Sequence, residues 1–176
     1  MGRLYTVLLS LLMHYRLYTS DDFPQLYAIE EACFEHRLRF DRRYMQRLVT
    51  RPSAATWIAE QAGRMAGFAA VGWSRQKNID VAYIQTLEVL PEKRGQGIGG
   101  ELLRRIEKSA CAAGATVIWL HVDAENAGAI RLYEAGGYQL TGREKDFYPE
   151  GRPALIYQKP LGETSEAASQ RDSQSA

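Results

Sequence analysis

The sequence predicts a single-domain α/β fold with one mixed central sheet flanked by helices. Apolar residues recur at every second position in some stretches and at every third or fourth position in others, which are the periods of strands and helices. In order, these stretches give a strand, two helices, three strands, a helix, a strand, a helix and two strands. No repeat or linker divides them, and 176 residues suffice for one domain with one core.

The first elements are a short strand and two helices. Polar and apolar residues alternate over residues 14–18, which predicts the strand. Asp22, with Gln25 three residues later, gives a possible capping box for a helix whose apolar stripe runs to Cys33. A second short helix is expected over residues 41–49.

Three strands follow. Residues 56–60 and 65–73 predict a hairpin, because the turn residues Ala62-Gly63-Arg64 lie between them. Residues 82–90 form a third strong strand pattern, and Pro91 ends it.

The second half of the chain begins with its clearest helix. Residues 97–113 carry apolar side chains at helical spacing, with Gly114 as the stop. Residues 116–122 form a nearly continuous β-branched and aromatic run, as expected of a buried central strand. The remaining expected elements are a helix over 127–134, ended by glycines 136–137, and strands over 138–145 and 154–159.

The two ends differ from this pattern. Arg3 precedes an apolar run at residues 7–12, but no small-residue cleavage site follows, and the run is shorter than the roughly 20 residues that span a bilayer. We expect residues 1–12 to be an arm or an upstream-start extension. The domain is expected over 13–160, with a disordered polar tail over 161–176.

Charge and cysteine usage narrow the class of protein. With 22 basic and 21 acidic residues, the net charge of +1 argues against a broad nucleic-acid surface. Cys33 and Cys111 have no closely spaced Cys or His partner, which argues against a zinc site and a disulfide scaffold. We therefore expect a cytoplasmic protein, monomeric or homodimeric, without a metal, nucleic-acid or membrane partner.

The most informative stretch is residues 91–100, Pro-Glu-Lys-Arg-Gly-Gln-Gly-Ile-Gly-Gly, where a strand ends and an amphipathic helix begins. Glycines let backbone N–H groups converge on one ligand, and a helix start adds partial positive charge and unpaired donors. This predicts a pyrophosphate site, with Lys93 and Arg94 beside it. No Lys-Ser or Lys-Thr follows the last glycine, and the spacing is not that of a dinucleotide-binding loop. A glycine-rich turn without a ligand is the alternative.

Two motifs resemble a known family. Arg94-x-x-Gly97-x-Gly99, between such a strand and helix, resembles the acetyl-coenzyme A signature of the GNAT acetyltransferase superfamily. Residues 126–138, Asn-Ala-Gly-Ala-Ile-Arg-Leu-Tyr-Glu-Ala-Gly-Gly-Tyr, resemble its second motif. The resemblance covers about residues 13–160. It implies a mostly antiparallel central sheet and acetyl-coenzyme A as co-substrate.

The resemblance also implies residue roles. The pantetheine arm would pair with the main chain of Leu87 and Val89 as an added strand. Asn126 would bond a pantetheine amide, and Tyr133 would protonate the departing thiolate; an ordinary core tyrosine is the alternative. The implied cofactor-binding residues are Leu87, Glu88, Val89, Arg94, Gly95, Gln96, Gly97, Ile98, Gly99, Gly100, Asn126 and Tyr133.

Acetylation of an amine also requires a base, since the attacking nitrogen must lose a proton. Tyr83 and His121 are the candidates, and His121 as a core residue is the alternative. The pair resembles the NatE type of N-terminal acetyltransferase, in which a tyrosine and a histidine at matching positions act through water. Arg143-x-x-x-Phe147-Tyr148-Pro149 resembles the RimI type, which usually carries Glu where His121 stands. Glu88 is the reserve base.

The acceptor is expected to be a polypeptide N-terminus. At pH 7 an α-amine is about 10% neutral and a lysine amine only about 0.04% neutral, so a histidine base suits the former. Phe34, Phe147 and Tyr148 are expected to border the substrate groove, with packing in the core or at the rim as the alternative. Glu35 follows Phe34 where the NatE type has proline, so no N-terminal sequence preference carries over. A small-amine acetyltransferase, acting on a polyamine, amino sugar or amino acid, and a non-catalytic acyl-coenzyme A sensor remain alternatives.

Overall fold

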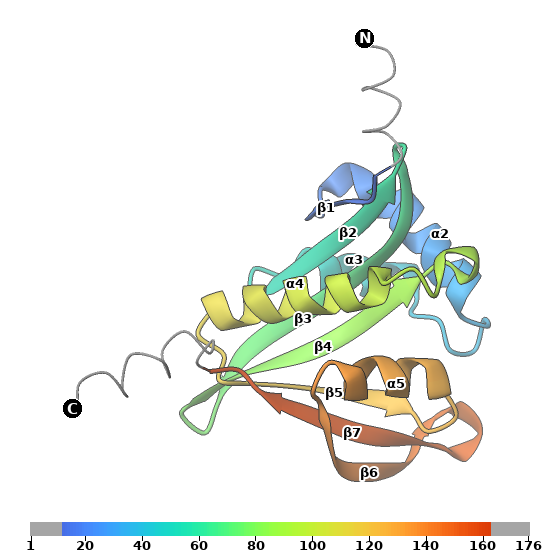
Figure 1. Cartoon of the computed structure of the whole chain (residues 1–176). Helices are drawn as coiled ribbons and strands as arrows, with labels where there is room; N and C mark the ends of the chain where they lie inside the picture. The colour runs from blue at the N-terminus through green and yellow to red at the C-terminus, as the bar shows by residue number, and fades with distance from the viewer. Residues whose placement is uncertain (1–11, 163–176) are drawn as a thin grey trace.

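The computed structural model describes residues 12–162 as a seven-stranded sheet with helices on both faces (Figure 1). The strands are β1 (His14–Leu17), β2 (Ala54–Gln61), β3 (Arg64–Gln76), β4 (Ile79–Val89), β5 (Val117–Asp123), β6 (Gln139–Tyr148) and β7 (Arg152–Pro160). The helices are α2 (Phe23–Cys33), α3 (Arg42–Val49), α4 (Ile98–Ala112) and α5 (Ala127–Ala135). Three-residue 3-10 turns lie at Ser20–Asp22, Pro91–Lys93 and Pro149–Gly151. The predicted class and element order are confirmed.

The strand order is β1-β2-β3-β4-β5-β7-β6, and every neighbouring pair is antiparallel except β4 and β5. The expected mostly antiparallel sheet is therefore confirmed. Helix α4 forms the crossover between the two parallel strands. These strands pair only at Val81–Val117, Ala82–Ile118 and Tyr83–Trp119, although β4 continues to Val89.

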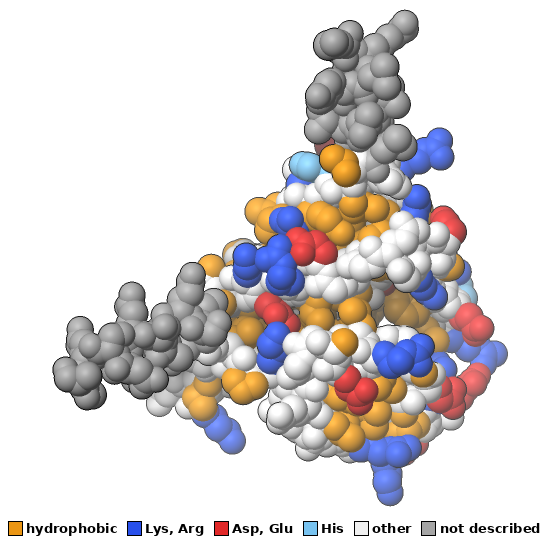
Figure 2. Space-filling view, viewed as in Figure 1, with side chains coloured by type: hydrophobic (Ala, Val, Ile, Leu, Met, Phe, Trp, Pro, Cys, Tyr) orange, Lys and Arg blue, Asp and Glu red, His pale blue; other side chains and the backbone are white. Residues whose placement is uncertain are grey.

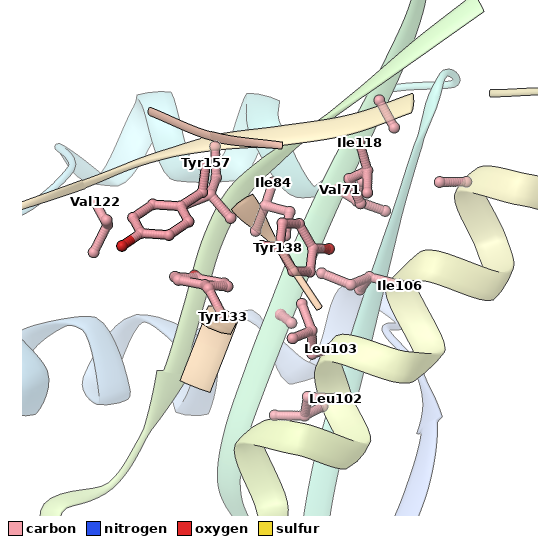
Figure 3. Close-up of a cluster of buried hydrophobic side chains, with 14 of the residues drawn as sticks. Val71, Ile84, Leu102, Leu103, Ile106, Ile118, Val122, Tyr133, Tyr138 and Tyr157 are labelled. Carbon is pink, nitrogen blue, oxygen red and sulfur yellow. The ribbon is translucent and has the colours of Figure 1, made fainter. Parts of the chain in front are cut away.

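Each face of the sheet has its own core. Helices α4 and α5 cover one face, where a cluster including Ile84, Leu103 and Ile118 is buried. Figure 3 shows these residues together with Tyr133, Tyr138 and Tyr157, whose rings fill the space beside α4. Helices α2 and α3 cover the other face through a second cluster that includes Leu26, Met45, Ile58 and Phe68.

The start of α2 corrects one expectation. Asp22 does not form a capping box with Gln25: its carboxylate accepts from the Thr19 N–H at 2.7 Å and from both Nη atoms of Arg16 at 2.7 Å. The Arg16 guanidinium holds the pKa of Asp22 down at about 2. Gln25 instead accepts a hydrogen bond from the Met65 N–H at 3.1 Å, which ties α2 to the sheet. Asp22 therefore takes part in a capping box with Thr19, three residues earlier, while its carboxylate also binds Arg16 of β1.

Other differences are small. Ala62 and Gly63 alone form the first hairpin turn, both with positive φ, and Arg64 already belongs to β3. The expected arm over residues 1–12 and tail over 161–176 lie almost wholly outside the described residues. Leu161 is described, and its N–H donates to the Thr116 carbonyl at 2.7 Å. No helix within residues 12–162 is both long and apolar enough to cross a membrane.

Candidate active site

The sheet opens beside the second half of β4. After Tyr83, β4 pairs with β3 on one edge but no longer with β5 on the other. The main chain around Leu87 and Val89 therefore has an edge without a strand partner within the described residues. Such an edge accepts an amide-bearing chain as an added strand, which fits the expected pantetheine position. Figure 2 shows hydrophobic side chains between α4 and α5, on the face above this opening.

The glycine-rich segment lies at the N-terminus of α4. Gly95 and Gly97 have φ of +74° and +79°, and Gly97 is the N-cap of the helix. A Cβ at Gly95, Gly97 or Gly100 would meet no protein atom within 4 Å. These three positions leave room for a ligand against the backbone. Unpaired N–H groups and the helix dipole favour an anion there, so the segment fits a pyrophosphate.

Gly99 has a different reason to be glycine. A Cβ there would lie 3.3 Å from Leu132 Cδ2 of α5 and 3.7 Å from Leu87 Cδ2 of β4. The close approach of α4 to α5 and β4 requires its small size. The Arg94 Nε donates to the Val89 carbonyl at 3.0 Å, so Arg94 also fastens the glycine-rich segment to the end of β4.

Asn126 and Tyr133 lie at the two ends of one face of α5. Asn126 caps the helix, its Oδ1 accepting from the Ala129 N–H at 3.1 Å. Tyr133 is buried, and burial, followed by the neighbouring hydroxyls of Tyr148 and Tyr83, raises its pKa. Its phenol is therefore protonated at neutral pH and able to donate a proton. The hydroxyls of Tyr83, Tyr133 and Tyr148 lie close enough to one another to interact electrostatically.

Tyr83 and His121 are in direct contact. The Tyr83 hydroxyl lies 3.1 Å from His121 Nδ1, and His121 Nε2 lies 3.0 Å from Glu144 Oε2. An ionised carboxylate can only accept a hydrogen bond. The contact with Glu144 therefore assigns the ring proton of His121 to Nε2. The Nδ1 lone pair then accepts the Tyr83 hydroxyl. We name Tyr83, His121 and Glu144 the Tyr–His–Glu array.

The array is mostly shielded from water. The His121 side chain is 9% exposed, whereas that of Glu144 is 52% exposed at the rim. Phe147 stacks on the imidazole with ring centroids 4.2 Å apart and an interplanar angle of 17°. Burial raises the pKa of Tyr83 to about 12, so its hydroxyl is a neutral donor at pH 7.

Of the three expected substrate residues, Phe147 and Tyr148 are joined to this array by ring contacts. Phe147 is 40% exposed, and Tyr148, half-buried, packs edge-on against it with centroids 4.9 Å apart. Phe34 is the C-cap of α2, and no ring contact joins it to Phe147 or Tyr148 among residues 12–162. An ion pair between Arg37 and Glu150 instead links the segment after α2 to the turn between β6 and β7.

Glu88, the reserve base, points away from solvent towards α2. Its side chain is 2% exposed and accepts from Thr86 Oγ1 at 2.7 Å. Burial, and then a hydrogen bond with the fully buried Glu30, raises the pKa of Glu88 well above its usual value. Glu88 is therefore placed to share a proton with Glu30 rather than to exchange one with a substrate.

This carboxyl pair predicts a pH-dependent stability. A raised folded-state pKa means that Glu88 favours the folded state most at pH below about 4.5, and that this contribution falls as pH rises towards the raised value. In Glu88→Gln, the amide keeps an acceptor for Thr86 and a donor for Glu30 without titrating. Between pH 5 and 8, the free energy of unfolding of the parent should fall relative to this variant by up to about 1.4 kcal/mol per pH unit.

Urea unfolding at several pH values measures this difference. Glu92→Gln, at an exposed position just after β4, is the matched control and should keep the pH dependence of the parent. Parallel curves for the parent and Glu88→Gln would contradict a shared proton between Glu30 and Glu88.

Comparison with known proteins decides the family. The model for the acetyltransferase (GNAT) family matches residues 23–138. The chain belongs to the GNAT acetyltransferase family. The matched segment runs from the first residue of α2 to the residue before β6 and contains the glycine-rich segment, Tyr83, His121 and Tyr133. The expectation of an acetyltransferase with acetyl-coenzyme A as co-substrate is thereby confirmed at the level of the family.

Individual relatives act on different amines. Streptothricin acetyltransferase of Streptomyces lavendulae is 37% identical over 110 residues, 60% of this chain and 57% of that enzyme. The ribosomal protein bS18-alanine N-acetyltransferase of Escherichia coli K12 is 35% identical over 104 residues, 57% of this chain and 68% of that enzyme. The chain thus spans between half and about two thirds of these relatives.

Solved structures agree with the fold. The crystal structure of the Escherichia coli ribosomal-protein-S18-alanine N-acetyltransferase matches with a TM-score of 0.74 and 25% identity, over 88% of this chain and 97% of that one. Arabidopsis thaliana NAA60 in complex with acetyl-CoA matches with a TM-score of 0.76 and 20% identity, over 85% of this chain and 99% of that one.

Glu144 is the one array residue that sequence reasoning missed. It belongs to β6, and β7 lies between β6 and the β5 strand that carries His121. The contact therefore depends on the strand order β5-β7-β6, which the local pattern does not contain. Its position three residues before Phe147, within the stretch already singled out, was the available signal.

Proposed function

We propose that this enzyme acetylates the N-terminal α-amine of a polypeptide, with acetyl-coenzyme A as donor. The observation that carries the proposal is the Tyr–His–Glu array, which begins at Tyr83, the last β4 residue paired with β5, and is bordered by Phe147. An array that accepts a proton through hydrogen-bonded, partly buried groups is what amine attack requires and what a passive acyl-coenzyme A sensor does not need. Two free cysteines, Cys33 and Cys111, are consistent with a reducing cytoplasm.

The Tyr–His–Glu array can relay a proton from the amine, through Tyr83, to His121. As the amine loses its proton to the Tyr83 oxygen, directly or through a water, the Tyr83 hydroxyl passes its own proton to His121 Nδ1. Glu144 then stabilises the imidazolium through Nε2–H, as a carboxylate does for a catalytic histidine. The ammonium proton thus ends on His121, and Tyr83 is neutral before and after the step.

The remaining residues complete the exchange. Bound acetyl-coenzyme A supplies the thioester carbonyl that the amine attacks, forming a C–N bond as the C–S bond breaks. Tyr133 is a neutral phenol in a buried position, so it can give its proton to the departing thiolate. Tyr133 would regain a proton from solvent or from His121 before the next cycle.

The acceptor class follows from the rim and from amine acidity. The exposed Phe147 and the partly exposed Tyr148 offer an apolar border with a hydroxyl, suited to an extended peptide. A base that works near neutral pH favours an amine that is about 10% neutral at pH 7 over a lysine amine. The similarity to the bS18-alanine N-acetyltransferase supports the same choice. The similarity to streptothricin acetyltransferase supports a small amine as the second candidate.

A competition between amines tests this proposal. Offered a peptide with a free N-terminus and one lysine, the enzyme should acetylate the α-amine first, with an initial rate ratio of about 10 or more given the difference in neutral amine. Peptide mapping by mass spectrometry measures the ratio. The same assay includes a polyamine, an amino sugar and streptothricin. Dominant lysine acetylation, or product from the small amines alone, would refute a peptide α-amine acceptor.

A further inference from the structure

A polar pocket lies beside Tyr83, and its lining residues do not include His121 or Glu144. Its lining residues come from the loop after α3, from β3, from β4 and from β5, and they are Arg51, Gly72, Trp73, Ser74, Gln76, Val81, Tyr83, Gln85 and Trp119. One of the nine carries a positive charge and none carries a negative charge. Tyr83 belongs both to this pocket and to the Tyr–His–Glu array, so a group bound here is one aromatic side chain away from the reacting amine.

The floor of the pocket is built by a β-bulge. In the pairing of β3 with β4, Ala70 lies opposite Thr86 and Val71 opposite Ile84, so Gln85 is the extra residue without a partner. Bulges beside active sites commonly redirect one side chain. The Gln85 amide nitrogen lies against Gly72, where a Cβ would be 3.4 Å from it. The bulge and the glycine together hold an N–H donor at the pocket floor.

Arg51 supplies the charge at the rim. Its side chain is exposed and forms no ion pair with any residue in the described range 12–162. By contrast, Arg37, Arg39 and Arg152 each face a carboxylate. A guanidinium with free donors matches a carboxylate, which can accept two parallel N–H bonds.

We infer that this pocket binds a carboxylate of the acceptor, so that the enzyme prefers peptides with an acidic side chain within their first three residues. The inference rests on the proposed peptide acceptor and specifies its chemistry. With the α-amine at Tyr83 and His121, consecutive Cα atoms are about 3.8 Å apart, which keeps a nearby Asp or Glu side chain within reach of Arg51. Arg51 and the Gln85 amide bind the carboxylate, and Trp119 forms an apolar wall.

Matched peptides test the preference. Two pairs of peptides differ only by Glu or Gln at position 2 or at position 3. For at least one pair, kcat/KM should be about five- to tenfold higher with Glu, as expected of one partly exposed charge-assisted contact. The gain should appear mainly in KM, because the contact forms before the chemical step.

Variants of two arginines locate the effect. Arg51→Gln should remove the preference for Glu, and Arg51→Glu should reverse it in favour of a peptide with Lys at the same position. Arg43→Gln removes the same charge from an exposed position of α3 outside the pocket and should keep the preference. Equal rates for Glu and Gln peptides in the parent, or an unchanged preference in Arg51→Gln, would overturn the inference.

A binding measurement separates this inference from the proposed function. Calorimetric titration of the already acetylated Glu and Gln peptides reports the pocket without any reaction, and the acetylated Glu peptide should bind more tightly in an Arg51-dependent way. If this holds while no peptide is acetylated, the carboxylate pocket stands and the peptide-acetylation proposal fails. If free glutamate, but no peptide, is acetylated faster than glutamine, the carboxylate belongs to a small acceptor, and the preference for acidic peptides is overturned.

Discussion

Replacing His121 with alanine is expected to lower kcat by about 10²–10⁴, the usual cost of losing a general base, while acetyl-coenzyme A affinity stays near the parental value. The imidazole contacts Tyr83, Glu144 and Phe147 rather than the sheet opening or the glycine-rich segment. The rates of the parent and the alanine variant are compared at one pH, so that the acceptor amine is neutral to the same extent in both measurements.

The other array members sharpen this test. Tyr83→Phe should also lower kcat, and the Tyr83→Phe, His121→Ala double variant should lose little beyond the worse single variant, because groups that act as one relay are not additive. A His121→Ala enzyme with near-parental kcat would make His121 a packing residue.

Glu144 should behave as a positioning residue, since it acts through His121. Glu144→Ala removes the acceptor of Nε2–H and should lower kcat about tenfold, the value of one hydrogen bond to a charged group. Glu144→Gln retains an amide oxygen and should restore part of the loss. Glu101→Gln, on α4 and paired with Arg104 and Arg105, is the control and should be neutral. Equal rates for the alanine and glutamine variants would argue against a hydrogen-bonding role.

Local patterns predicted the elements well because each depends on neighbouring residues alone. The helix from Ile98 to Ala112 and the strand from Val117 to Asp123 carry their periodicity within single segments. The glycines before α4 are likewise a local feature, since the positive φ of Gly95 and Gly97 depends on the turn that they form. The predicted ends of these elements differ from the observed ends by only one to a few residues.

Contacts between distant segments were not predictable in the same way. Asp22 has the residue type and position of a cap, yet Arg16 from β1 binds its carboxylate. Glu144 reaches His121 across an intervening strand, and Gln85 gains its place from a register shift between two strands. In each case a long-range partner decides the role of the side chain. Gly99 illustrates the same point. Its small size is required by Leu132 and Leu87, which lie on other elements of the fold.

Replacing Gly97 with alanine is expected to weaken acetyl-coenzyme A binding by about tenfold or more, because a methyl group would obstruct the approach of the pyrophosphate to the backbone N–H groups. Losing one charge-assisted hydrogen bond costs about 1.5–3 kcal/mol, which is roughly 10- to 100-fold in affinity. The space around Gly97 is otherwise free, since a Cβ there meets no protein atom within 4 Å. Only a ligand would therefore be displaced.

Gly114 at the opposite end of α4 separates obstruction from backbone strain. Its φ is +89°, close to the +79° of Gly97, and a Cβ there also meets nothing within 4 Å. Alanine at either position should therefore cost a similar 1–2 kcal/mol or so of stability, the penalty of a left-handed conformation. Thermal unfolding measures that cost, and calorimetric titration measures the affinity for acetyl-coenzyme A. Gly114→Ala should bind it as the parent does; equal affinities in both variants would place the pyrophosphate away from the N-terminus of α4.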